Sequence, residues 1–185
     1  YGQGLWERRA PYPIAATEVS AATLNGKIYA LCGLLSTGGR TGTLYIYDPY
    51  RDEWAGGPAV PIDGGGDHCN VAAVNGKLYV LGALRSGTGA ADGNTYEFDP
   101  ATGNWTTVAR MGEARGAGGV AVIGNRIYVA GGLAGTVAVN TFEVFDTETR
   151  QWSRLAPMPT VRDHLTGAAT TPTADADDAI AMDHR

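Results

Sequence analysis

Tryptophan recurs along this chain at a nearly constant interval, and this spacing is the strongest constraint on the fold. The intervals are 48, 51 and 47 residues, between Trp6, Trp54, Trp105 and Trp152. Self-similarity at such a period indicates copies of one supersecondary unit, which buries its hydrophobic face only by stacking on neighbouring copies. We therefore expect a repeat architecture.

Two further markers follow the same period. A tyrosine recurs at intervals of 50 and 49 residues in the segments NGKIYALCG (25–33), NGKLYVLGA (75–83) and GNRIYVAGG (124–132). An aromatic residue followed by aspartate lies seven residues before each later tryptophan, in YDPYRDEW (47–54), FDPATGNW (98–105) and FDTETRQW (145–152). The agreement of three markers indicates a true structural repeat.

Each repeat predicts four short antiparallel strands, A to D. Strand A is a run of small apolar residues, such as 69–74 or 118–123. A glycine–asparagine pair then supplies the left-handed backbone of a tight turn, and strand B carries the tyrosine. Strand C ends at the aspartate, where Asp-Pro suits a type I turn, and strand D carries the tryptophan. With 27 glycines and only 18% charged residues, the composition also favours short strands over helices.

Strand B ends in small residues in each repeat, namely Cys32-Gly33, Gly82-Ala83 and Gly131-Gly132. Missing or small side chains at a strand end allow another backbone to approach closely. The loop that follows varies in length, because the distance from the tyrosine to the aromatic residue of strand C is 18, 19 or 17 residues.

The order of these features resembles the Kelch repeat, whose period is about 50 residues. The resemblance implies an all-β fold of Kelch-type β-propeller blades, each a four-stranded antiparallel sheet, over residues 1–170. The repeat units are expected near 15–56, 66–107 and 115–156, with a partial unit at 162–170. Because a closed propeller has about 4 to 8 blades, we expect an incomplete ring, a fragment able to self-associate through its unclosed blade edges. Residues 171–185 lack the repeat markers and are expected to be a disordered or non-native tail.

The geometry of a four-stranded blade separates two faces of the propeller. The A–B and C–D turns, which have constant length, lie on one face, and the B–C loop and D–A connection lie on the other. The second face carries the variable loops and is the expected binding face. Its candidate ligand-binding residues are Arg40, Asp67, His68, Arg85, Arg115, Arg162, Asp163 and His164.

Arg115 and Arg162 occupy equivalent positions at the start of strand A in the third and fourth repeats. The resemblance implies a ligand role for them, because Kelch domains that capture acidic peptides commonly use arginines at this position. Two arginines on one rim can hold a carboxylate through paired hydrogen bonds. The alternative, a structural ion pair with an acid of a neighbouring blade, is the more common arrangement for a rim arginine.

The pairs Asp67-His68 and Asp163-His164 are equivalent and lie two blades apart. Because adjacent residues of a strand point to opposite faces, we predict that neither pair forms an Asp–His dyad. Two histidines that met across the channel would still lack a third metal ligand in the sequence. We therefore predict no metal and no cofactor.

The formal net charge of −5 provides no basic field, so nucleic acids and membrane surfaces are not expected partners. The longest apolar runs, such as 78–84, are far shorter than the roughly 20 residues that cross a bilayer. Cys32 and Cys69 lie in strand-like apolar runs and are expected to be buried free thiols. Because the sequence begins at Tyr1 and not at a methionine, we assign the protein to no cellular compartment.

A Kelch-repeat binding module for a protein or peptide, without evident catalysis, is the preferred interpretation. The resemblance leaves two enzymes open, because some Kelch-like propellers are sugar mutarotases and others are copper oxidases of the galactose oxidase type. A mutarotase would take a carbohydrate and would use mouth residues as acid and base, with the candidates Asp67, His68, Arg115, Arg162 and His164. A copper oxidase requires two tyrosines, two histidines and a cysteine joined to one tyrosine, a set that the sequence does not show.

Overall fold

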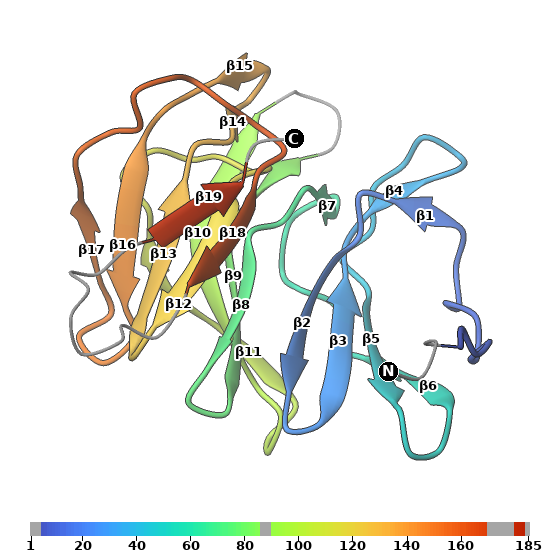
Figure 1. The fold of residues 1–185 in the computed structure, drawn as a ribbon. Helices are drawn as coiled ribbons and strands as arrows, with labels where there is room; N and C mark the ends of the chain where they lie inside the picture. Colours follow the sequence, from blue (N-terminus) through green and yellow to red (C-terminus); the bar gives the residue numbers. More distant parts are fainter. Residues whose placement is uncertain (1–4, 86–89, 170–179, 184–185) are drawn as a thin grey trace.

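The computed structural model describes residues 5–85, 90–169 and 180–183 of the 185-residue chain. All the regular elements within these ranges are β-strands, which confirms the predicted all-β class (Figure 1). In the part of the chain that the structure describes, no helix is long and apolar enough to span a membrane.

Three antiparallel sheets follow one another along the chain, and each contains four blade strands in the order of the sequence, to which the second sheet adds the short strand β7 (Gly66–Asp67). The first contains β2 (Ser20–Leu24), β3 (Lys27–Leu31), β5 (Leu44–Asp48) and β6 (Glu53–Gly57). The second contains β8 (Val71–Val74), β9 (Lys77–Arg85), β10 (Ala91–Asp99) and β11 (Asn104–Arg110). The third contains β12 (Gly119–Ile123), β13 (Arg126–Ala130), β16 (Phe142–Asp146) and β17 (Gln151–Arg154). These sheets are propeller blades, with the predicted strands A to D in order.

Short strands lie on the loop face, at the upper end of Figure 1, opposite the tight A–B turns. They are β1 (Ala16–Thr17), paired with β4 (Leu34–Leu35), β7 (Gly66–Asp67), paired with β9, and β14 (Leu133–Ala134), paired with β15 (Val137–Ala138). A partial fourth sheet contains β18 (Thr166–Ala169) and β19 (Ile180–Asp183). Strand β19 falls in the segment predicted as a disordered tail, so the structure differs from the prediction there. The rest of 171–185 lies outside the described residues.

The inner strands of successive blades pack beside one another, because β2 contacts β8, β8 contacts β12 and β12 contacts β18 (Figure 1). Between the blades, the aromatic markers of one repeat pack on those of the next. The ring of Tyr29 lies 6.3 Å from that of Phe98, and the ring of Tyr79 lies 6.0 Å from that of Phe145. All four side chains are buried. Their recurrence in the sequence therefore reflects packing between blades.

Three of the repeated tryptophans bond to the chain that precedes their own strand. The indole nitrogen of Trp54 donates to the carbonyl of Ala10 at 3.1 Å, and that of Trp105 donates to the carbonyl of Pro58 at 2.9 Å. The indole nitrogen of Trp152 donates to the hydroxyl of Thr95 at 2.9 Å. Trp6, the first of the repeated tryptophans, belongs to no strand and is fully exposed.

The small residues at the end of strand B allow the close backbone approach that the sequence predicts. A Cβ atom at Gly131 would lie 2.6 Å from the carbonyl oxygen of Arg162, and one at the equivalent Gly82 would lie 2.3 Å from that of Arg115. The amide of Gly132 also donates to the carbonyl of Arg162 at 2.8 Å. Glycine at these positions therefore lets the start of the next blade pack directly on strand B.

Candidate functional site

A left-handed backbone position recurs where the chain enters the inner strand of each blade. Its residues are Glu18, His68, Ala117 and His164, with φ angles of 55°, 50°, 56° and 53°. Few non-glycine residues adopt this conformation, so its presence in four consecutive repeats marks one shared local backbone. We call these four residues the inner-rim positions.

Hydrogen bonds join the inner-rim positions of successive blades. The amide of Ala117 donates to the carbonyl of His68, and the amide of His164 donates to the carbonyl of Ala117, both at 2.8 Å. Between the first two blades, the hydroxyl of Ser20 donates to the carbonyl of Cys69 at 2.8 Å. These bonds hold equivalent residues of neighbouring blades at one level.

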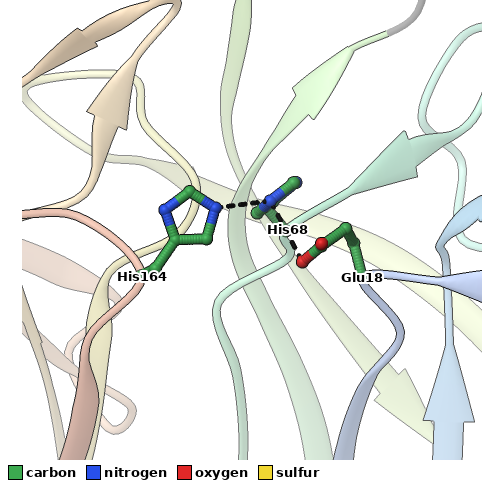
Figure 2. Close-up of side chains that lie close together, drawn as sticks. All are labelled: Glu18, His68 and His164. Atoms are coloured by element: carbon green, nitrogen blue, oxygen red, sulfur yellow. Dashed lines mark hydrogen bonds and ion pairs between the residues drawn. The ribbon is translucent and has the colours of Figure 1, made fainter. Parts of the chain in front are cut away.

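Three inner-rim side chains, Glu18, His68 and His164, meet in what we call the rim cluster (Figure 2). The Nε2 atom of His68 lies 2.8 Å from Nε2 of His164 and 3.1 Å from Oε2 of Glu18. The imidazole rings meet edge-on, with centroids 4.7 Å apart and an interplanar angle of 82°. The cluster lines a pocket of about 300 Å³, together with Ala117 and Leu165 among others.

Each histidine of the rim cluster has the preceding aspartate against its other ring nitrogen. Nδ1 of His164 is hydrogen-bonded to Oδ1 of Asp163 at 2.5 Å, and Nδ1 of His68 lies 3.1 Å from Oδ1 of Asp67. The second contact is not aligned as a hydrogen bond, which leaves both its atoms without a hydrogen-bond partner among the described residues. The prediction that neighbouring residues cannot form such a dyad is wrong for Asp163 and His164, because the left-handed backbone at His164 interrupts strand alternation.

Asp67 is almost completely buried and is held from the first blade. Nε of Arg40, in the B–C loop of that blade, donates to Oδ2 of Asp67 at 2.8 Å. A buried carboxylate requires a cationic or hydrogen-bonding partner to offset its lost hydration. Arg40 therefore holds Asp67 in place, and Asp67 in turn lies against His68 of the rim cluster.

Arg115, predicted as a ligand-face residue, is fully buried. Its guanidinium pairs with the carboxylate of Glu143 and donates to the carbonyls of Glu113, Val129 and Gly131. Burial lowers the pKa of Arg115, and the carboxylate of Glu143 opposes that shift. Arg115 is therefore paired with an acid of its own blade and is buried away from the loop surface, where the predicted ligand role would place it.

The two other arginines of the predicted set lie outside the rim cluster. Arg162, the repeat equivalent of Arg115, is exposed, and its Nε donates to the hydroxyl of Thr160 at 3.2 Å. Arg85 ends β9 and lies 3.4 Å from the carboxylate of Asp63, in a contact open to solvent. The structure therefore brings together Arg40, Asp67, His68, Asp163 and His164, and leaves Arg85, Arg115 and Arg162 apart from them.

Glu18 is the member of the rim cluster that sequence reasoning missed. The repeat itself contained the signal, because Glu18 precedes Tyr29 by the same eleven residues that separate His68 from Tyr79. Glu18 is not found by looking for histidine or cysteine alone, because the residue type differs between the repeats. Alignment of the repeats by position identifies Glu18 as the equivalent of His68.

Comparison with known proteins agrees with the repeat structure. The family model described as the Kelch motif matches residues 114–159, which include the third blade. Kelch-like protein terF of Aspergillus terreus is 32% identical over 163 residues, which cover 80% of this chain and 35% of that protein. The chain belongs to the Kelch repeat family. A second Kelch relative, Kelch-like protein 25 of Xenopus tropicalis, is 23% identical over 83% of this chain and 25% of its own length.

This Kelch chain spans about a third or less of the length of these curated relatives. Among solved structures, that of YjhT superposes with a TM-score of 0.76 over 90% of this chain and 60% of the YjhT chain, at 18% sequence identity. The likeness to YjhT supports the propeller fold. It carries no statement about activity.

Proposed function

We propose that this Kelch chain is a binding module that presents its B–C and D–A loop face to a protein or peptide. One observation carries the proposal: the inner-rim positions share one backbone conformation but bear different side chains, namely Glu18, His68, Ala117 and His164. Residues that stabilise a repeat recur in every copy, whereas a partner is recognised by a surface that does not repeat. The loop face provides such a surface.

The opposite face shows the contrasting pattern. There, each strand C ends in an aspartate that pairs with a cation at the start of strand B of its own blade. The N···O distances are 3.2, 2.5 and 3.4 Å for Lys27–Asp48, Lys77–Asp99 and Arg126–Asp146. The same ion pair in three successive repeats indicates a role in holding the turns, and this face therefore supports no specific partner.

The chemistry of the loop face suits a peptide that carries both polar and acidic groups. Arg162 is exposed and forms no ion pair within the described ranges, so its guanidinium is available to a carboxylate. His164 and Glu18 present a further donor or acceptor beside the pocket of about 300 Å³. The pocket is too small for a folded partner to enter, so a peptide or a loop of a protein is the expected occupant.

The enzyme alternatives have less support from the geometry. No tyrosine lines the rim pocket among the residues that the structure describes, so the ligand set of a galactose-oxidase-like copper centre has no counterpart there. Of the five residues assigned to a mutarotase, Asp67 and Arg115 are buried and held by Arg40 and Glu143. We therefore retain the binding module.

Selection of peptides from a random phage-displayed library on the immobilised full chain tests this proposal. A selected peptide is then titrated by fluorescence anisotropy against the wild type, Arg162→Ala, and the matched control Arg126→Ala on the opposite face. Loss of one charge-assisted hydrogen bond predicts about tenfold weaker binding for Arg162→Ala and an unchanged affinity for Arg126→Ala. Binding that is lost in Arg126→Ala and kept in Arg162→Ala would contradict the assigned face.

A further inference from the structure

We propose that Glu18, His68 and His164 form a site for a divalent transition metal of the zinc type, held between the first, second and fourth blades. Each residue offers one donor atom, and these atoms all lie within 4.8 Å of one another. Two imidazole nitrogens and a carboxylate oxygen are a ligand set that zinc accepts. The inference goes beyond the proposed peptide binding and does not depend on it.

The outer ring nitrogens determine which atoms face the centre of the rim cluster. Nδ1 of His164 is bonded to the carboxylate of Asp163, and Nδ1 of His68 faces the carboxylate of Asp67. Only the contact at His164 is aligned as a hydrogen bond, but a lone pair at either Nδ1 would face a carboxylate oxygen and be repelled by it, so we assign a hydrogen to each Nδ1. Each Nε2 then carries a lone pair, which is the form of imidazole that binds a metal.

With this proton assignment, the centre of the rim cluster contains only acceptors. The Nε2 lone pairs of His68 and His164 face each other across 2.8 Å, and a carboxylate oxygen of Glu18 lies 3.1 Å from Nε2 of His68. Electron pairs at these distances repel one another unless a cation lies between them. A bound metal ion supplies that cation and accepts all three pairs.

Two of the three donor-atom separations need only small changes to reach coordination distances, and the third, between Glu18 and His164, is at most 4.8 Å. In a tetrahedral site with zinc–ligand bonds of about 2.0–2.2 Å, neighbouring ligand atoms are roughly 3.3–3.5 Å apart. The present separations of 2.8 and 3.1 Å are shorter by a few tenths of an ångström. The side chains of Glu18 and His164 are 42% and 52% exposed, so both can shift outward without disturbing the core.

The surroundings of the rim cluster also match those of a metal site. Asp163 bonds to the outer nitrogen of His164, as in the carboxylate–histidine–metal arrangement that orients a ligand ring and fixes its tautomer, and Asp67 lies 3.1 Å from the outer nitrogen of His68. For His68 this aspartate is fixed in turn by Arg40. The third blade places Ala117, which has no donor, at its inner-rim position. A metal held by the other three residues would therefore keep an open position for water or for a group of a bound ligand.

Equilibrium dialysis of the full chain against Zn²⁺ at neutral pH tests the proposal. We expect one ion per chain for the wild type, and an affinity lower by at least about tenfold for His164→Ala and for Glu18→Gln. The matched control is His184→Ala, which removes the third histidine of the sequence and should leave the affinity unchanged. Zn²⁺ should also raise the Tm of the wild type and of His184→Ala only.

Glu18→Gln keeps the test valid if His164→Ala fails to fold, because the change is nearly isosteric and the position is exposed. Equal affinity of the wild type and Glu18→Gln would overturn the proposal. So would a wild type that takes up no Zn²⁺, in which case a proton shared between the two histidines would be the cation at the centre of the cluster.

Discussion

The guanidinium of Arg115 and the carboxylate of Glu143 form an ion pair inside the third blade, with side-chain exposures of 0% and 4%. Three further hydrogen bonds run from Arg115 to main-chain carbonyls, so each of its three nitrogens donates at least one bond. The pair joins the D–A connection to β13 and β16. The equivalent Arg162 has a different environment, because Arg115 is buried in the core and Arg162 is on the surface.

Replacement of Arg115 by alanine is therefore expected to destabilise the chain strongly. Loss of the guanidinium leaves the Glu143 carboxylate buried without its cation, which costs about 3–5 kcal/mol of unfolding free energy. Urea denaturation followed by circular dichroism measures this loss. Arg162→Ala, at the exposed equivalent position, should change the free energy by less than about 0.5 kcal/mol. Similar effects of the two substitutions would show that Arg115 is not buried as described.

Asn70 links the second and third blades through buried hydrogen bonds. Its side-chain nitrogen donates to the carbonyls of Leu81 and Arg115, and its oxygen accepts from the amide of Gly118. Asn70→Ala leaves these buried groups unsatisfied and should cost about 1–3 kcal/mol by urea denaturation. Asn104→Ala, at an exposed position without a left-handed backbone, serves as the control. If both variants unfold at the wild-type urea concentration, the link does not contribute.

Asp99 predicts a loss of stability in acid. The ammonium of Lys77, followed by the amide of Ala101, holds the pKa of Asp99 below its usual value. The native state thus favours the ionised carboxyl, and this stabilisation is present above about pH 4 and disappears as the pH falls through the lowered native pKa. Asp99→Asn should unfold at a lower urea concentration than the wild type at pH 7 and at nearly the same one near pH 2. Asp63→Asn, at an exposed position, should match the wild type at both.

Tyr79 predicts the opposite dependence at high pH. Burial, together with the hydrogen bond to the Glu97 carboxylate, raises the pKa of the Tyr79 hydroxyl. The native state holds this proton more tightly than the unfolded chain, so the stabilisation is complete below about pH 10 and is lost as the pH rises above it. In Tyr79→Phe, the Tm measured from pH 9 to 12 should fall less steeply than in the wild type. Tyr50→Phe, at an exposed position, should retain the wild-type slope.

The blade architecture could be predicted because it depends on features that recur. The aromatic residues that pack between blades, the asparagine–glycine turns and the equivalent glycines Gly82 and Gly131 each have one structural cause that acts in more than one repeat. Spacing alone reveals such causes. The pairing of β19 with β18 has no such marker, and the sequence did not indicate it.

The site was harder to predict because its residues depend on contacts that the repeat does not show. Arg115 and Arg162 align, yet only Arg115 meets an acid, Glu143, which lies 28 residues further along the chain. The rim cluster depends on a left-handed backbone at His68 and His164. The extended strand that the sequence suggests there would place each histidine and its preceding aspartate on opposite faces.

The main-chain bonds between His68, Ala117 and His164 use no side-chain atoms, and they do not require any particular residue at these positions. A substitution there changes the chemistry of the rim while the frame that aims the side chain inward stays the same. Single substitutions at the inner-rim positions can therefore change which groups the rim offers to a ligand without removing these main-chain bonds.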